Sequence, residues 1–291
     1  MRVVVAIGGN ALLRRGERAD AATQLRNVGA VTCDLAAVAA EHELLIVHGN
    51  GPQVGLLAEE SERDPTLERG YPLDTLVAET QGMIGYWLAQ GIGRASDRPV
   101  AAVVTQVVVD ADDPAFTCPS KPVGPYYPEP GDEGAFKKDR YGWRRIVASP
   151  TPVRVVELPV IARLLESGCT VIAGGGGGVP VLPDLTGVAA VVDKDLVAAL
   201  LAERLGAGLL VILTDVPAVM QDHGTPYERP IGTVTPNDLD PRDFAPGSMR
   251  PKIEAARRFV TATGRATLIG HLNDMALVLK GEAGTRIQKE Q

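Results

Sequence analysis

Short apolar runs rich in β-branched residues alternate with segments of helical periodicity along most of this chain. Such alternation is typical of a parallel sheet with helices packed on both of its faces. We therefore predict an α/β fold built on a mostly parallel sheet. The predicted strands are residues 2–7, 44–47, 100–109, 170–173 and 209–213, and the predicted helices are 23–40, 73–90, 159–167, 195–205 and 253–260.

Three of the apolar runs lead directly into glycine-rich turns. In an open parallel sheet, ligands bind beyond the carboxyl ends of the strands, where such turns gather. Glycine lets successive backbone N–H groups converge on one anion, and the following helix N-termini favour negative charge. We therefore predict one shared anion site, which is the candidate active site. Its turn residues are Gly8, Gly9 and Asn10, then Gly49, Asn50 and Gly51, and then Gly175, Gly176 and Gly177 within the run 174–178.

Composition and charge narrow the classes of function. The chain has 291 residues, 45% hydrophobic content and a net charge of −7, which argues against a nucleic-acid surface or a polybasic membrane contact. The longest apolar stretch is too short to span a bilayer, and no secretory signal precedes the first strand. The three cysteines lack metal-ligand spacing and are typical of reduced thiols. We expect a cytoplasmic protein that binds neither nucleic acid nor membrane.

Phosphoryl transfer fits the remaining signals, although the usual nucleotide motifs are missing. The sequence contains no P-loop, no dinucleotide fingerprint and no protein-kinase motif. The cations would then come from Lys121, Lys194 and Lys252, because lysines and backbone amides stabilise the charge on a phosphoryl group in transit. Asp195 would orient those cations. The histidines share no motif, and we assign no protein-bound metal.

One region interrupts the alternation. Residues 112–152 are rich in proline, glycine, lysine and aromatic residues, with a strand-like segment at 145–148. A long irregular insertion in a compact α/β domain is usually a lid or a disordered segment, and the aromatic residues favour an ordered lid. We predict a small protruding lid subdomain that carries Lys121.

Several stretches, in order along the chain, closely resemble those of the carbamate kinases, a family of the amino acid kinase superfamily. The matching stretches span residues 3 to 260. They are residues 6–11, 48–55, 72–74, 80–88, 105–110, 121–125, 142–145, 193–195 and 244–249.

The resemblance implies a three-layer αβα sandwich, usually assembled as a homodimer. The implied reaction is reversible phosphoryl transfer between ATP and carbamate, giving ADP and carbamoyl phosphate, with Mg²⁺ bound with the nucleotide. Residues 1–291 would form a single amino acid kinase domain, with an acceptor-binding lobe at 1–192, the lid at 112–152 and a nucleotide-binding lobe at 193–291.

The resemblance also implies roles for particular residues. The two glycine-asparagine turns would form the acceptor and phosphoryl pocket. Lys194 and Lys252 would neutralise the phosphates, Asp195 would organise them, and Lys121 would move with the lid onto the substrate. The implied nucleotide wall comprises Thr214, Asp215, Val216, Ala245, Pro246, Gly247, Ser248 and Met249.

Two other functions stay open. The first is a superfamily kinase that phosphorylates another small carboxylate or UMP, although such relatives carry a lysine in the first glycine turn, and Ala6-Ile7-Gly8 has none. The second is a non-catalytic regulator that binds nucleotide or carbamoyl phosphate. Carbamate is already an anion and attacks without a general base. A site of amides and lysines without a catalytic histidine suits that substrate.

Overall fold

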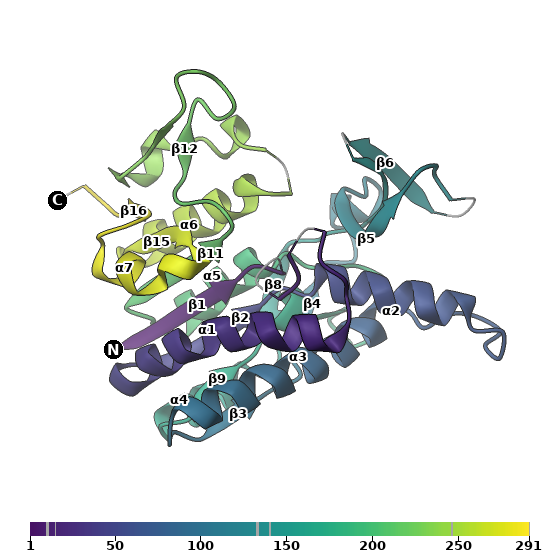
Figure 1. Cartoon of the computed structure of the whole chain (residues 1–291), viewed down its shortest axis with the longest axis horizontal. Helices are drawn as coiled ribbons and strands as arrows, with labels where there is room; N and C mark the ends of the chain where they lie inside the picture. The colour runs from purple at the N-terminus through teal and green to yellow at the C-terminus, as the bar shows by residue number, and fades with distance from the viewer. Residues whose placement is uncertain (10–11, 15, 132–133, 140, 246, 291) are drawn as a thin grey trace.

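One large sheet organises the molecule (Figure 1). The computed structural model describes residues 1–9, 12–14, 16–131, 134–139, 141–245 and 247–290. The first strand of the chain, residues 2–7, lies inside the sheet and runs parallel to both of its neighbours. The strands at 267–271 and 285–287, near the C-terminal edge, are antiparallel to each other. From edge to edge the sheet contains β14 (Thr233–Val234), β16 (Thr285–Ile287), β15 (Thr267–His271), β11 (Leu209–Thr214), β1 (Arg2–Ile7), β2 (Glu43–His48), β9 (Thr170–Ile172) and β3 (Val100–Ala102).

Helices cover both faces of this sheet because its strands are apolar on both sides. In β1, Val4 and Ala6 point into one core, whereas Val3, Val5 and Ile7 point into the other. The predicted three-layer αβα sandwich is confirmed. One face is covered by α1 (Ala21–Glu41), α3 (Leu73–Ala95) and α7 (Met275–Lys280), and the other by α4 (Leu158–Glu166), α5 (Lys194–Arg204) and α6 (Met249–Thr263).

The predicted lid is a small antiparallel sheet that stands out from the body (Figure 1). Its strands are β5 (Lys121–Tyr127), β7 (Gly142–Val147) and β6 (Ala135–Asp139), in that order. The base of the lid packs on α2 (Gly51–Arg63), where the backbones of Gly55 and Gly124 approach so closely that a Cβ on Gly55 would collide with Gly124. The predicted strand at 145–148 is the end of β7, which begins earlier and stops at Val147.

The prediction of one strand over 100–109 is wrong. The chain forms β3 in the main sheet and then β4 (Gln106–Val109) in a second sheet, between β10 (Val179–Val181) and β8 (Pro152–Val155). The break occurs because Thr105 is held by a side chain: its backbone N–H donates to Oε1 of Gln81 at 2.8 Å. A tertiary contact therefore ends the pairing of β3.

A short hairpin, β12 (Met220–Gln221) and β13 (Arg229–Pro230), extends from the C-terminal part of the chain. In the described part of the chain, no helix has the length and apolar composition needed to cross a membrane.

Candidate active site

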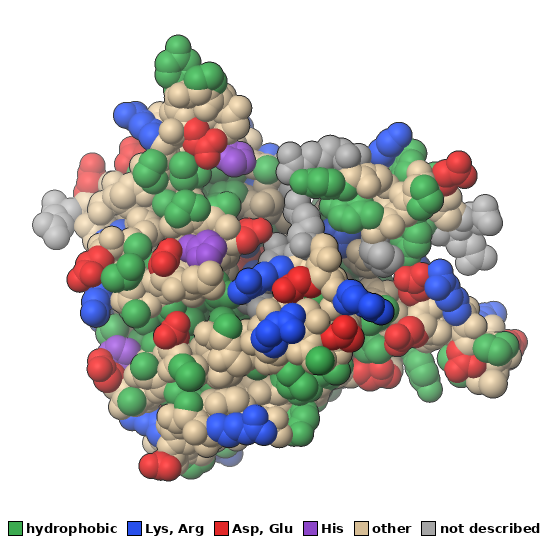
Figure 2. Space-filling view, in the orientation of Figure 1, with side chains coloured by type: hydrophobic (Ala, Val, Ile, Leu, Met, Phe, Trp, Pro, Cys, Tyr) green, Lys and Arg blue, Asp and Glu red, His purple; other side chains and the backbone are tan. Residues whose placement is uncertain are grey.

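Three helices begin at one cavity of about 220 Å³. The first residue of α2, Gly51, lines it, as do the first residue of α5, Lys194, and the residue that precedes α6, Ser248. Helix N-termini present unpaired N–H groups and a positive dipole end. The cavity therefore favours an anion before any side-chain charge is counted. Figure 2 shows a hollow between the lid and the part of the chain that contains β12. The elements that line the cavity border this hollow.

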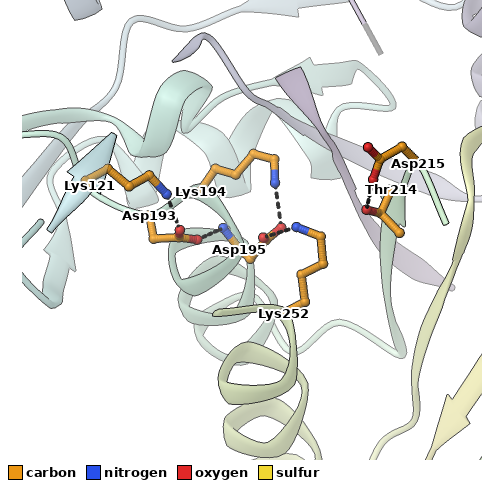
Figure 3. A network of polar contacts seen from close by, with 7 residues as sticks. All are labelled: Lys121, Asp193, Lys194, Asp195, Thr214, Asp215 and Lys252. Atoms are coloured by element: carbon orange, nitrogen blue, oxygen red, sulfur yellow. Dashed lines mark hydrogen bonds and ion pairs between the residues drawn. The ribbon is translucent and has the colours of Figure 1, made fainter. Parts of the chain in front are cut away.

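Asp195 joins two lysines at the base of this cavity (Figure 3). Its Oδ1 accepts from Nζ of Lys194 at 2.8 Å, and its Oδ2 accepts from Nζ of Lys252 at 2.9 Å. Burial alone would raise the pKa of the Asp195 carboxyl, but the two ammonium groups outweigh burial and hold that pKa well below its usual range. Asp195 is therefore ionised and holds both ammonium groups in place.

The surroundings of the two lysines shift their pKa values in opposite directions. Burial lowers the pKa of Lys194, and the neighbouring Lys252 adds to this effect while Asp195 opposes it. For Lys252, the carboxylates of Asp195 and Asp193 outweigh burial and raise the pKa. Both side chains are 12% exposed. An anion that enters the cavity would meet two desolvated cations from different helices.

Lys121 reaches the same cavity from the lid. Its Nζ lies 2.5 Å from Oδ2 of Asp193. The other oxygen of Asp193 accepts from the backbone N–H of Asp195 at 2.9 Å, so Asp193 also caps α5. Burial would raise the pKa of Asp193, but Lys121 outweighs it and the pKa is lowered. The predicted lysines thus meet at one cavity, with Lys121 held by a carboxylate that also fixes the start of α5.

The glycine turns divide into residues at the cavity and residues behind it. Asn10 lies outside the described residues, and Asn50 is held by a hydrogen bond of 2.8 Å from its Nδ2 to Thr80. The predicted turn residues that line the cavity are Gly9, Gly49, Asn50, Gly51 and Gly176, whereas Gly8, Gly175 and Gly177 do not line it.

The run of five glycines is mainly a site of close packing. Gly176 has a φ of +65° and Gly177 a φ of +92°, a region that favours glycine. A Cβ on Gly176 would collide with the side chain of Asn50, and one on Gly177 with the carbonyl of Val192. The run therefore brings the turn at residues 49–51 and the start of α5 together. Of the predicted phosphate-binding glycines in the run, only Gly176 lines the cavity.

His48 supports the turns from below. It is 1% exposed, its Nδ1 lies 3.1 Å from the carbonyl oxygen of Gly49, and a Cβ on Gly175 would collide with its ring. Burial lowers the pKa of His48 to about 4. The imidazole is neutral at physiological pH and fills space between two turns.

A second cavity, of about 780 Å³, adjoins the first at Ser248. Its wall includes the apolar residues Val216, Phe244 and Met249 together with five aspartates, and none of the described residues that line it is a lysine or arginine. Pro246 lies outside the described residues. Of the other predicted nucleotide-binding residues, this cavity is lined by Thr214, Asp215, Val216, Ala245, Ser248 and Met249, and Gly247 lines the smaller cavity.

Two charged residues of the smaller cavity, Asp193 and Arg144, were not assigned from the sequence. Asp193 precedes α5 at the position of an N-cap, and Asp is a preferred N-cap residue, so the local pattern could have identified its structural role. Arg144 lies on the lid strand β7 and lines the cavity beside Lys121. Neither signal alone indicates a ligand.

The geometry agrees with comparisons to known proteins. Residues 1–271 match the model of the amino acid kinase family. A carbamate kinase of Rhizobium meliloti is 48% identical over 303 residues, covering 99% of this chain and 93% of the relative. One of Haemophilus influenzae is 45% identical and covers 100% of this chain and 97% of the relative. A solved structure, the carbamate kinase from Giardia lamblia bound to AMP-PNP, is 34% identical with a TM-score of 0.89, covering 99% of this chain and 98% of that one.

These similarities extend over the full chain and include the lid, both glycine turns and the segments that carry all three lysines. The chain therefore belongs to the amino acid kinase family and, within it, to the carbamate kinases, which are ATP-dependent phosphotransferases.

Proposed function

We propose that this protein transfers a phosphoryl group reversibly between ATP and carbamate. The observation that carries the proposal is the convergence of Lys121, Lys194 and Lys252 on one cavity where three helices begin. A metaphosphate-like group spreads its charge over three oxygens, and cations with fixed N–H groups stabilise such a charge.

The two cavities suit the two substrates. ATP or ADP would place its base and ribose in the larger cavity, where apolar side chains and aspartate oxygens can contact the ring and the hydroxyls. The phosphates would extend past Ser248, which lines both cavities. Carbamate or carbamoyl phosphate would lie at Gly9, Gly49 and Gly51, opposite the lysines of α5 and α6.

The reaction needs no proton transfer. Toward ATP, an oxygen of the ADP β-phosphate attacks phosphorus, the bond from phosphorus to the carbamoyl oxygen breaks, and carbamate leaves as an anion. Charge is conserved because the electron pair of the broken bond stays on the carbamate oxygen. Lys194 and Lys252 would stabilise the phosphoryl oxygens throughout, and Asp195 would hold both ammonium groups in place.

Mg²⁺ would arrive with the nucleotide. This ion takes most of its ligands from phosphate oxygens and water, so it needs few from protein. Both oxygens of Asp195 are taken by lysines, and no group of three or more His, Cys, Asp or Glu side chains among the described residues is arranged to hold a metal. We expect EDTA to abolish activity and added Mg²⁺ to restore it.

We further propose that residues 1–192 form the acceptor-binding lobe and 193–291 the nucleotide-binding lobe, with 112–152 as a mobile lid, and that two copies form a homodimer. Exposed apolar side chains near the β3 edge, Tyr86 and Val104, support a dimer surface there. Static light scattering would test the oligomeric state.

The decisive assay is ATP formation by the purified protein from ADP, Mg²⁺ and carbamoyl phosphate, with acetyl phosphate as a matched donor that lacks the amino group. We expect strong preference for carbamoyl phosphate. Turnover with acetyl phosphate alone would favour another carboxylate acceptor. Binding of both substrates without turnover would favour a regulator.

A further inference from the structure

Arg144 is a second lid cation at the smaller cavity. It lies on β7, and its Nε and Nη2 donate to the carbonyl oxygen of Gly124 at 3.2 and 2.9 Å. Its guanidinium lies 5.2 Å from the centre of the Tyr126 ring. The side chain is half-buried and lines the cavity together with Lys121. Two contacts thus fix the guanidinium while it borders the cavity.

The carbonyl that holds Arg144 is itself fixed to the body of the protein. Gly124 has a φ of +70°, and its backbone packs against Gly55 of α2. The same helix begins at Gly51, a residue of the acceptor turn that lines the cavity. Arg144 is therefore placed relative to the acceptor end of the cavity, whereas Lys194 and Lys252 come from α5 and α6.

The charge of Arg144 has no carboxylate partner among the described residues. The other lid cation at the cavity, Lys121, pairs with Asp193. The next residue in sequence, Arg145, pairs with Glu62 at 2.5 Å. A half-buried guanidinium held by a carbonyl and a ring retains its full positive charge for a ligand. The bonds to Gly124 do not use Nη1 or the second N–H of Nη2, and this remaining planar fork of donors matches a carboxylate better than an ammonium does.

We propose that Arg144 binds the acceptor: the carboxylate of carbamate or, in carbamoyl phosphate, the carbonyl oxygen of the carbamoyl group. This inference rests on the proposed function. Arg144 would set the affinity for the acceptor, and the lysines of α5 and α6 would act on the transferring phosphoryl group. Because the bond to Arg144 is made before and during transfer, its loss raises KM more than it lowers kcat.

The test compares R144M with R145M. Both variants remove one guanidinium from β7, but Arg145 joins the lid to α2 through Glu62 and does not line the cavity. Loss of a hydrogen bond to a charged group typically weakens binding by roughly 10- to 100-fold. We expect R144M to raise the KM for carbamoyl phosphate by that factor with the KM for ADP nearly unchanged, and R145M to change neither substantially. R144K, which keeps the charge without the fork, should be intermediate.

A second measurement separates this proposal from the function on which it rests. Titration calorimetry with acetate, a carboxylate close in size to carbamate that carries no phosphoryl group, reports binding without turnover, and R144M should bind acetate more weakly than R145M does. If wild type forms no ATP from carbamoyl phosphate, the proposed function fails while the calorimetry still decides the role of Arg144. Equal losses in R144M and R145M, or an unchanged KM and acetate affinity in R144M, would overturn the proposal. If R144M does not fold, R144K against R145M decides by the same criteria.

Discussion

The smaller cavity is lined by three lysines, an arginine and two aspartates, whereas the larger cavity beside it is lined by five aspartates and by no described lysine or arginine. The smaller cavity lies where three helices begin. In it, Asp193 pairs with Lys121 and Asp195 pairs with Lys194. The larger one has apolar walls and more than three times the volume, about 780 against 220 Å³. Among the residues that the structure describes, the two cavities share Ser248 alone.

This difference in charge predicts which cavity binds the phosphates of a nucleotide and which binds its base and ribose. Phosphates would be repelled by the aspartates of the larger cavity and attracted by the lysines of the smaller one. A base and a ribose have no net charge and need apolar contact and acceptor oxygens. The comparison therefore predicts that substitutions in one cavity leave the use of the other ligand intact.

The largest effect is expected for the lysines that flank Asp195. K194A and K252A should each reduce kcat by about 10²- to 10³-fold, the typical cost of removing one preorganised donor. Steady-state kinetics of ATP formation would measure this loss, with circular dichroism to check the fold. K280A, an exposed lysine at the end of α7, is the matched control. Near-normal turnover in either cavity variant would remove that lysine from the mechanism.

The lid lysine should separate the two ligands. K121A should raise the KM for carbamoyl phosphate by roughly 10-fold or more, the scale of one lost charge-assisted contact, while the KM for ADP changes little. Lys121, on β5, lines the smaller cavity and does not line the larger one. The control is K137A, an exposed lysine on β6 of the same lid. Equal losses for both substrates would contradict the assignment of Lys121 to the acceptor side.

The layers of this fold were predictable because each element carries its own period. The apolar runs at β1, β2 and β11 and the helices between them follow from local pattern alone. The break between β3 and β4 was not, because it depends on the bond from Thr105 to Gln81, 24 residues away in sequence. No local signal in residues 100–109 marks that break.

The site was predictable in part, for a different reason. The glycine turns were correctly expected to meet, but glycine is required both where a ligand approaches and where backbone packs on backbone. Gly176 lines the cavity, whereas Gly177 packs on the Val192 carbonyl. Sequence cannot separate these two requirements. Lys121 and Lys252 were expected to supply cations because phosphoryl transfer requires them, and the family resemblance implied the same, but periodicity did not predict that they converge.

The larger cavity offers the converse of the lid experiment. V216W should fill the wall where the base is expected and raise the KM for ADP by roughly 10-fold, the equivalent of about 1.4 kcal/mol, with the KM for carbamoyl phosphate unchanged. Val216 lines the larger cavity and not the smaller one. V153W, at an exposed valine on β8, controls for a bulky surface residue. A rise in both KM values would mean that the cavities are not independent.

The last prediction concerns stability in acid and not activity, at His48 beneath the smaller cavity. Burial lowers the pKa of His48 from an ordinary 6.5 to about 4, so the unfolded chain binds this proton over a pH range in which the folded chain does not. The stability that the neutral imidazole contributes is complete above pH 6.5 and is lost as the pH falls toward 4. The stability that comes from the lowered pKa values of Asp193 and Asp195 is lost below their ordinary value of 3.8, and thus in a separate pH window.

Urea unfolding of wild type and H48Q at pH 7 and pH 4.5 would measure this contribution. Between these pH values, wild type should lose about 2 kcal/mol more unfolding free energy than H48Q, because each unit of pKa shift corresponds to about 1.4 kcal/mol. The carboxylates that also titrate in this range are common to both proteins and cancel in the difference. The relevant quantity is therefore the change with pH and not the absolute stability, which the substitution lowers by disturbing the contact with Gly175. Equal losses of unfolding free energy in wild type and H48Q would show that His48 is protonated in the folded protein at pH 4.5. A positive charge would then lie beside Gly49 and Gly175.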